Sequence, residues 1–599
     1  MKFIDGGRKM VCVFCNVAND VPAEYQQHLD HNNNRVDKFS RPELCRGSYE
    51  YKATKDYCEN QKQPNPPAIV FCIDVTTNAV KSGMVATACQ KIKQMLKSLP
   101  KDPKSQTSNM KVAIICYTRV LHFFNLGKNQ QTAKQMIVSD VGDIFVPLQD
   151  GFLADPNEKI ELIESVLDQI PTLFQNNNEN ESVFAPVLQA ANQALSDNEC
   201  NGKVIVFHSS GLPTAEAPGK LKPHDDAKLL NTNKEHLLWQ SADPVYTEIA
   251  TNKDTGCVAN GVSVDLFLFA SQHSDVATLT EVSRLTSGNV FRYSYFDADR
   301  DSEQFCNDLE TAVTSIQAFD CTMRIRTSLG IRPVEFYGNH YMENTVDIRY
   351  AAMSEHQSTT VELKHDDKLE AQYCFVQIAI LYTTVSGERR IRLHNLTLGV
   401  AQKHNDVFQF SNVNTLMSYL LKQAIAEGRT KENAAIKQNL IDKSVNILAA
   451  YRKYCSQQSP AGQLILPETL KLLPLYLHSL HRHDVLSSSS NIPRDARAYY
   501  RAILQSKDVL GIQNLLYPTV LEVSKIQPLE NRPGTASRCR YSKLNPASCY
   551  LITNGLNLFL WVGANVDPEY LKGVFNVQNV QQITERVRIW FFVCFQNLF

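Results

Sequence analysis

The stretch that decides the fold is AIVFCIDV, residues 68–75, an uninterrupted apolar run set off from the preceding chain by the polar, proline-rich segment NQKQPNPP at 60–67. Runs of this kind are typical of a central strand that is buried on both faces of a sheet. Residues 79–99 follow with the three- and four-residue spacing of an amphipathic helix. The pattern predicts a buried strand and a helix that covers it.

The alternation of strand and helix continues to residue 318. Further apolar runs predict strands at 110–118, 203–209 and 262–270. Helical spacing predicts helices at 158–170, 183–197, 275–286 and 302–316. Strands that alternate with helices imply βαβ units and a mostly parallel sheet covered on both faces, so residues 67–318 are predicted to form one α/β domain. The polar insert at 214–236 is expected on its surface.

The period of the apolar residues changes twice beyond this domain. Residues 319–405 alternate apolar and polar side chains between turn residues, which predicts a β-sandwich or barrel. Residues 406–515 return to helical spacing and are predicted to form an all-α module. Within residues 516–599 the sequence predicts strands around a turn at Asn554-Gly555. The chain is therefore multidomain, with α/β, β and α parts.

Composition and charge narrow the function class. The net charge of −1 gives no global field that would favour nucleic acid or an anionic membrane. No window approaches the about 20 apolar residues that span a bilayer, and the opening MKFIDGGRKM lacks the apolar core of a secretory signal. The sixteen cysteines are scattered singly through apolar runs, which suits reduced thiols in the cytosol better than a disulfide framework.

A C-x-x-C pair near the start raises the question of a metal. Cys12 and Cys15 have the spacing that presents two thiolates to a tetrahedral zinc ion, which needs four ligands. His28 and His31 follow, but only two residues separate them, whereas two-Cys, two-His fingers need three to five. Residues 1–30 therefore carry either half of a zinc site or a plain pair of thiols.

Tests for enzyme chemistry are negative. The sequence contains no phosphate-binding G-x-x-x-x-G-K-[ST] loop, no G-x-G-x-x-G and no G-x-S-x-G elbow. One motif follows the central strand, where Asp74, Thr76 and Asn78 have the spacing of a metal site in von Willebrand A-type domains. The alternative is that Thr76 and Asn78 cap a helix that begins near Ala79. Both interpretations stay open, and no constellation supports an enzyme.

Several stretches, in this order of modules, resemble one known family. They include CVFCNVANDVPAEY, RVDKFSRPEL, PPAIVFCIDVTTNAV, SDVGDIFVPLQDGFL and NGLNLFLWVGA. The chain resembles the cargo-adaptor subunits of the inner COPII coat, the Sec24 family, and is similar to the branch with the vertebrate C and D paralogues. The resemblance implies a partial zinc finger at 1–30, an extended segment at 31–66 that joins the β-barrel, a von Willebrand A-like trunk, and a truncated gelsolin-like domain whose tail diverges from about 584.

The resemblance implies binding and no catalysis. Such adaptors pair with the sister Sec23-type subunit, the coat's small GTPase and outer-coat subunits, on the cytosolic face of the endoplasmic reticulum and on its vesicles. They select the cytosolic tails of cargo and SNARE proteins for export to the Golgi, and contact the membrane peripherally. Cys12 and Cys15 match the second half of a four-cysteine zinc (Zn2+) site whose first half this chain does not contain.

The resemblance also implies a cargo site. Arg35 resembles one of the arginines of a basic cargo pocket in the family, and Arg41 is a neighbouring candidate. Both would pair with acidic or carboxylate-bearing signals. Asp37 stands where other branches carry a tyrosine, and the alternative for both arginines is a solvated surface role. Rival interpretations are the sister Sec23-type subunit, a metal-dependent von Willebrand A-type interaction module, and an actin regulator.

Overall fold

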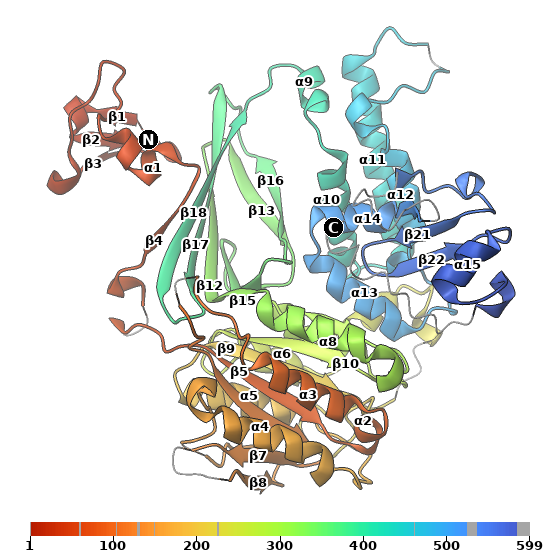
Figure 1. Ribbon diagram of the computed structural model, residues 1–599. Coiled ribbons are helices and arrows are strands. Elements are labelled where there is room, and N and C mark those ends of the chain that lie inside the picture. Colours follow the sequence, from red (N-terminus) through yellow and green to blue (C-terminus); the bar gives the residue numbers. More distant parts are fainter. Residues whose placement is uncertain are drawn as a thin grey trace. The chain divides into compact units, whose positions relative to one another are not determined.

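The computed structural model describes residues 2–58, 61–103, 105–127, 132–148, 150–223, 227–460, 462–523 and 536–583 (Figure 1). Its internal contacts divide the chain into two compact units. The first unit comprises residues 1–402, 425–432 and 488–506, and the second comprises residues 403–424, 433–487 and 507–599. The tail predicted to diverge from about 584 lies outside the described residues. Among the described helices, none is long and apolar enough to cross a membrane.

The first unit is built on a seven-stranded sheet with the order β11-β10-β9-β5-β6-β7-β8. Its strands are β5 (Ala68–Asp74), β6 (Lys111–Tyr117), β7 (Leu121–Asn125), β8 (Lys134–Val138), β9 (Gly202–His208), β10 (Val262–Leu268) and β11 (Val290–Arg292). The five strands from β11 to β6 run parallel, and β7 and β8 add an antiparallel hairpin. The mostly parallel sheet is confirmed. The hairpin was not predicted, because its short strands mix polar and apolar residues.

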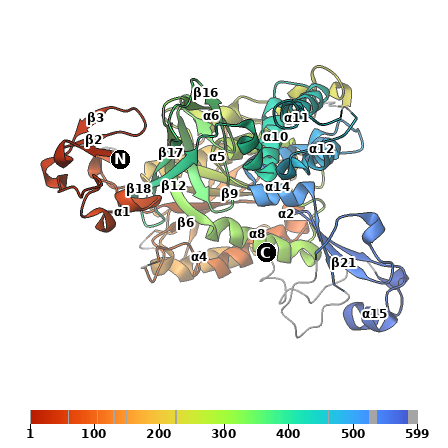
Figure 2. The ribbon, with the colours of Figure 1, turned by 90° about the horizontal axis from the view of Figure 1, so that it is seen from above.

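Helices cover both faces of this sheet. They are α2 (Thr77–Lys81), α3 (Met84–Met95), α4 (Pro156–Leu173), α5 (Ala185–Asp197), α6 (Val245–Thr251), α7 (Val276–Leu285) and α8 (Ala298–Thr314). Phe71 of β5 joins the core formed with α3, α4 and α8, and its neighbour Val70 joins the core formed with α5, α6 and α7. Figure 2 shows α4 and α8 along the same side of this sheet. Because alternate residues of β5 enter different cores, the strand must be apolar throughout.

The helix expected over 79–99 is interrupted. Helix α2 begins at Thr77 and not near Ala79, and it stops before Gly83, after which α3 begins. Gly83 has a φ of +76°, and a Cβ at this position would lie 2.6 Å from the Cβ of Ala298. The left-handed backbone and the close approach of α8 explain both the break and the glycine.

The insert at 214–236 is not wholly a surface excursion. Ala215, Leu221 and Glu235 are buried, and Leu221 belongs to the same core as α5. The prediction rested on the polarity of the segment. It was wrong in these places because isolated apolar residues in a polar segment can still reach a core, and because the buried Glu235 carboxylate accepts a hydrogen bond from the Ser488 hydroxyl.

The β part of the first unit contains a six-stranded sheet, β14-β15-β12-β17-β18-β4, and a two-stranded sheet, β13-β16. The strands are β4 (Ser48–Lys52), β12 (Ile316–Thr327), β13 (Ile331–Tyr337), β14 (Tyr341–Met342), β15 (Asp347–Ser354), β16 (Thr360–His365), β17 (Tyr373–Thr383) and β18 (Arg389–Gly399). Met323 of β12 and Ile331 of β13 belong to the core between the sheets. The β-sandwich is confirmed, and its edge strand β4 comes from the N-terminal part of the chain.

The N-terminal segment forms a small antiparallel sheet of β1 (Lys2–Ile4), β2 (Lys9–Val11) and β3 (Ala18–Asp20). Phe3 and Val21 are buried. A short helix, α1 (Pro42–Cys45), precedes β4 and has proline in its first turn, where the missing N–H has no helical partner to lose.

The second unit contains helices and a four-stranded sheet of order β20-β19-β21-β22. Its elements are α9 (His404–Gln409), most of α10 (Val413–Glu427), α11 (Asn433–Cys455), α12 (Leu473–Arg482), α14 (Val509–Leu516), β19 (Thr519–Glu522), β20 (Ala536–Ser537), β21 (Cys549–Thr553), β22 (Leu558–Val562) and α15 (Pro568–Phe575). The predicted turn at Asn554-Gly555 joins β21 to β22, and Gly555 has a φ of +80°. The helical part and the turn are confirmed.

Helix α13 (Arg494–Ser506) lies in the sequence between α12 and α14 of the second unit but belongs to the first unit. The Asp495 carboxylate accepts hydrogen bonds from the N–H groups of Ser274 (2.8 Å) and Val276 (3.0 Å) at the start of α7. Arg494 pairs with Asp275 at 3.1 Å. Helix α7 has no side-chain cap of its own. Its N-terminus is therefore capped by a residue 219 positions away in the sequence.

Candidate functional site

The C-x-x-C pair occupies the turn between β2 and β3. The Asn16 N–H donates to the Cys12 carbonyl at 2.9 Å, and the Cys12 N–H donates to the Val17 carbonyl at 3.0 Å. Cys15 is exposed and Cys12 is partly exposed. Partial burial raises the pKa of the Cys12 thiol, but hydrogen bonds from the backbone of Cys15 and Phe14 outweigh it and the net pKa is lowered. A thiol held in this way is a suitable ligand for a metal.

Among the described residues, Cys12 and Cys15 are the two candidate ligands for a zinc ion at this turn. Within the described residues, no group of three or more Cys, His, Asp or Glu side chains could hold a metal ion, and this includes His28 and His31. A structural zinc ion needs four ligands, so Cys12 and Cys15 supply only half of a site. The described residues therefore fit the incomplete zinc site that the resemblance implied, with Cys12 and Cys15 as two of four ligands.

Arg35 lies beneath the surface of the N-terminal segment. Its side chain is only 2% exposed, and two of its nitrogens, Nε and Nη2, donate to the two carboxylate oxygens of Asp37 at 2.8 and 2.7 Å. The remaining nitrogen, Nη1, donates to the Tyr25 carbonyl. The guanidinium carbon lies 4.0 Å from the centre of the Tyr25 ring and 5.6 Å from that of Phe3. Arg35 thus holds the segment together, and its hydrogen-bonding edges are occupied.

Arg41 lies on the outside of the same cluster. Its side chain is 41% exposed, and its Nε donates to Asp37 at 3.2 Å. Its guanidinium carbon lies 5.0 Å from the centre of the Tyr25 ring. The outer edge of this guanidinium, Nη1 and Nη2, is the part of the two arginines that a ligand can reach.

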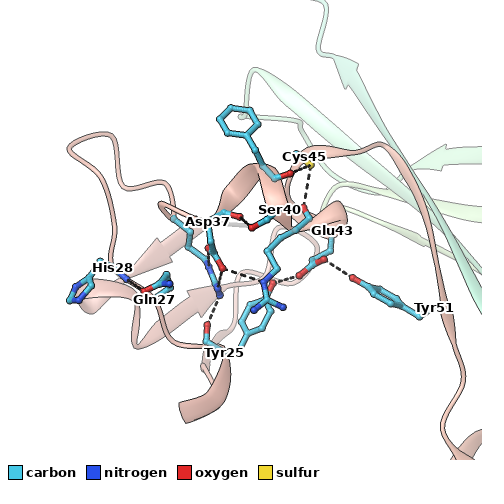
Figure 3. A network of polar contacts seen from close by, with 11 residues as sticks. Tyr25, Gln27, His28, Asp37, Ser40, Glu43, Cys45 and Tyr51 are labelled. Atoms are coloured by element: carbon cyan, nitrogen blue, oxygen red, sulfur yellow. Dashed lines mark hydrogen bonds and ion pairs between the residues drawn. The ribbon is translucent and has the colours of Figure 1, made fainter.

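Two tyrosines hold a second carboxylate beside the arginines. Figure 3 shows Glu43 of α1 between Tyr25 and Tyr51, whose hydroxyls donate to its two oxygens at 2.5 and 2.6 Å. Burial raises the pKa of Glu43, but these hydrogen bonds outweigh it and the net pKa is lowered. The hydrogen bonds from Arg35 hold the pKa of Asp37 at about 2. Both carboxylates therefore stay charged near neutral pH.

Sequence reasoning placed Arg35 and Arg41 in one segment but missed the residues that define their surroundings. Tyr25, Glu43 and Tyr51 were not predicted as parts of the site. The spacing of Arg35 and Asp37 was a usable signal, because opposite charges two residues apart can pair within a turn. The contacts to Tyr51 required the return of β4, which no local pattern shows. The predicted pairing of the arginines with an acidic signal is not tested by these contacts and stays a prediction.

Asp74 lies at the carboxyl end of the central strand β5, and its carboxylate accepts hydrogen bonds from the backbone. One Asp74 oxygen accepts the Thr76 N–H at 2.8 Å, and the other accepts the N–H groups of Ser209 (2.8 Å) and Ser210 (3.0 Å). The side chain is fully buried. Thr76 occupies the position before α2, but its side chain makes no capping hydrogen bond, so the expected cap is not formed in that way. The carboxylate is used to join the ends of β5 and β9.

Comparison with protein families finds matches along almost the whole chain. Five family models match: the Sec23/Sec24 zinc finger (1–25), trunk domain (64–313), beta-sandwich domain (318–401) and helical domain (412–513), and the gelsolin repeat (531–589). The matched segments follow the order of the modules described above.

Individual relatives agree with the family models. The chain is 45% identical to human protein transport protein Sec24C over 98% of its length and 54% of that protein, and 45% identical to human Sec24D over 97% and 56%. A crystal structure of the human COPII-coat protein Sec24c matches with a TM-score of 0.92 at 44% identity, covering 98% of this chain and 77% of that one. The chain spans about half the length of these curated relatives.

Proposed function

Because the chain belongs to the Sec24 family of protein transport proteins, we propose that it is a COPII coat component that selects cargo for export from the endoplasmic reticulum to the Golgi. It acts by binding the short cytosolic sorting signals of membrane proteins and has no catalytic role. The observation that carries the proposal is the match to the human Sec24c structure, which extends over nearly the whole chain.

The proposed partners are those of the family. The chain pairs with a Sec23-type subunit through the trunk, and the pair joins the coat's small GTPase and outer-coat subunits on the cytosolic face of the membrane. Cargo and SNARE tails are its ligands. Short extended peptides bind weakly one at a time, so polymerisation of the coat supplies the avidity that captures them.

We assign the cargo contact at the candidate site to Arg41. Its exposed outer edge donates hydrogen bonds to oxygen acceptors of the tail. Arg35 is a positioning residue, because its contacts with Asp37 and Tyr25 fix the segment that carries Arg41. Half of the zinc site, Cys12 and Cys15, lies in the same N-terminal segment.

The rival interpretations receive less support. A sister Sec23-type subunit is disfavoured because the most similar relatives described above are Sec24 proteins. A metal-dependent von Willebrand A-type module is disfavoured because three backbone N–H groups occupy the Asp74 carboxylate. An actin regulator would rest on the gelsolin-like part alone, which covers a small share of the chain.

The proposal is tested by assembly on liposomes. Residues 1–599, a Sec23-type partner and the activated small GTPase are sedimented with liposomes that display cargo tails. The expected result is co-sedimentation of all three proteins with enrichment of the tails. Arg41→Ala should reduce tail capture without preventing assembly, and Arg46→Ala, an exposed arginine five residues away, serves as the matched control. Failure of the chain to join the Sec23-type partner would contradict the proposal.

A further inference from the structure

A small cavity lies in the first unit, where helices α3 and α4 pack side by side (Figure 1). Its volume is about 180 Å³, and its lining comes from the end of α3, the loop that follows, and the start of α4. The apolar part of the lining consists of Leu96, Leu99, Pro156 and Ile160, and the first three of these are buried. The cavity therefore reaches down to the core of the domain and is separate from the N-terminal segment.

Hydrogen bonds hold the two sides of the cavity together. The Asn157 side-chain amide at the start of α4 donates to the Ser108 carbonyl at 2.8 Å. Beside it, the N–H groups of Val112 and Ala154 donate to each other's carbonyls at 2.8 and 2.9 Å. The Ser108 hydroxyl closes the loop by donating to the Pro100 carbonyl at 2.6 Å. The cavity is therefore largely pre-formed, as small-molecule sites usually are.

Two lysines give the cavity a net positive charge. Lys97 and Lys101 are the only charged side chains among the described residues that line it. Lys101 Nζ donates to the Gln106 carbonyl at 2.9 Å. Within the described part of the chain, neither lysine forms an ion pair with a carboxylate. An ammonium group has three donors, so both lysines can donate to a ligand.

The aspartates that neighbour these residues in the sequence are engaged in other contacts. Asp102 accepts a hydrogen bond from the hydroxyl of Ser386, between β17 and β18. Asp155 caps α4 and accepts the Asn157 N–H at 2.8 Å. Neither aspartate lines the cavity. An anion that enters the cavity therefore meets two ammonium groups and no carboxylate of the described lining.

Neutral donors complete the polar part of the lining. Thr107 and Ser108 contribute hydroxyls, and Gln106 and Asn157 contribute amides. A phosphate monoester carries about −1.5 to −2 charges at neutral pH and has three strong acceptor oxygens. These oxygens match two lysines and several neutral donors, whereas a carboxylate brings one charge and two oxygens. A cavity of this volume admits a small ligand and excludes a folded protein.

We propose that the cavity between α3 and α4 is a binding site for a phosphate monoester. Lys97 and Lys101 pair with its phosphate oxygens, and the apolar lining contacts the carbon atoms of the ester. The site is distinct from the cargo contact assigned to Arg41, so the inference goes beyond the proposed function and does not depend on it. The same phosphate chemistry occurs in soluble esters and in the headgroup of phosphatidic acid, and the experiment distinguishes these two sources.

Isothermal titration calorimetry of residues 1–599 with glycerol 3-phosphate tests the site. We expect the wild-type chain to bind this ester and Lys97→Gln/Lys101→Gln to weaken binding about tenfold or more, because each lysine supplies a charge-assisted hydrogen bond. Gln106→Glu, at an exposed position, adds a carboxylate to the lining and should weaken binding similarly. Lys81→Gln/Lys134→Gln is the matched control, because it removes two exposed lysine charges outside the cavity, and it should bind as the wild type does.

Vesicles identify the source of the phosphate. Phosphatidylcholine vesicles that contain phosphatidic acid are compared with vesicles that contain phosphatidylglycerol, whose phosphate is a diester. Co-sedimentation that requires phosphatidic acid and is lost in Lys97→Gln/Lys101→Gln assigns the site to a lipid headgroup, and binding of glycerol 3-phosphate alone assigns it to a soluble ester. Binding that this double variant leaves unchanged, or that the control variant weakens equally, would overturn the inference. Tighter binding of acetate than of glycerol 3-phosphate, or no binding of either phosphate probe, would also overturn it.

Discussion

Replacing Asp495 by alanine should detach α13 from the start of α7. The carboxylate accepts two backbone N–H groups, from Ser274 and Val276, and a third contact from His273 Nδ1 at 3.1 Å. Hydrogen bonds to a charged group contribute about 1.5–3 kcal/mol each, and loss of a helix cap typically costs about 0.5–2 kcal/mol. We expect the free energy of local opening to fall by about 2–4 kcal/mol, which corresponds to roughly 30- to 1000-fold faster amide exchange.

Hydrogen exchange measured by mass spectrometry is the suitable assay, because a multidomain chain does not unfold in two states. Exchange should accelerate in the first turn of α7 and along α13, while β5 in the centre of the sheet serves as the internal control. Asp495→Asn keeps one acceptor oxygen and should show about half the effect. Unchanged exchange at α7 in the alanine variant would refute the assignment of Asp495 as its cap.

The same contact predicts a pH dependence. The hydrogen bond that His273 donates to the Asp495 carboxylate raises the pKa of His273 above its ordinary value of 6.5. A group with a raised pKa in the folded state contributes stability that is fully present below its unfolded pKa and is lost as the pH rises through the folded pKa. After correction for intrinsic rates, the protection of α7 should therefore decline as the pH rises above 6.5 in the wild-type chain. It should be flat in Asp495→Asn.

Three further predictions concern other parts of the first unit. Lys203→Met should destabilise the trunk by about 3–5 kcal/mol, because it leaves the carboxylate of the buried Asp265, 2.6 Å from the lysine nitrogen, without its counter-charge. Thermal melting measures this loss of stability, and an unchanged melting midpoint would contradict the prediction. Asp74→Ala should lower the melting temperature, whereas calorimetry should detect no tight Mg²⁺ binding to the wild-type chain; a tight magnesium isotherm would revive the metal interpretation. Chelator treatment should leave the melting temperature of residues 1–599 unchanged, because Cys12 and Cys15 supply only two ligands, and one tightly held zinc per chain would disprove it.

Local patterns of apolar residues in the sequence predicted much of the fold. The apolar run at 68–75 predicted β5, and the alternation that follows predicted the parallel sheet, because a strand buried on both faces must be apolar in every position. The antiparallel hairpin β7-β8 was not predicted, because its two strands are short and mix polar with apolar residues. The break at Gly83 escaped because it depends on the approach of α8, which lies more than 200 positions further along the chain.

The candidate site was less accessible to sequence reasoning. The positions of Arg35 and Arg41 were found through the resemblance of RVDKFSRPEL to a family stretch. The sequence could not show that Arg35 is occupied by Asp37 and that Arg41 keeps an open edge, because burial is a property of the packed segment. It also could not show the position of Tyr51 beside Glu43, which depends on the pairing of β4 with β18.

The sequence by itself determined the order of the modules and the helical or strand character of each, because the periodicity of apolar residues is a local property of the chain. Only the tertiary structure decided which residues far apart in the sequence come into contact. Tyr51 lies beside Ile391, and Asp495 caps α7, across separations of hundreds of residues. Such contacts are fixed by the packing of whole elements, and no pattern within a short window of sequence encodes them.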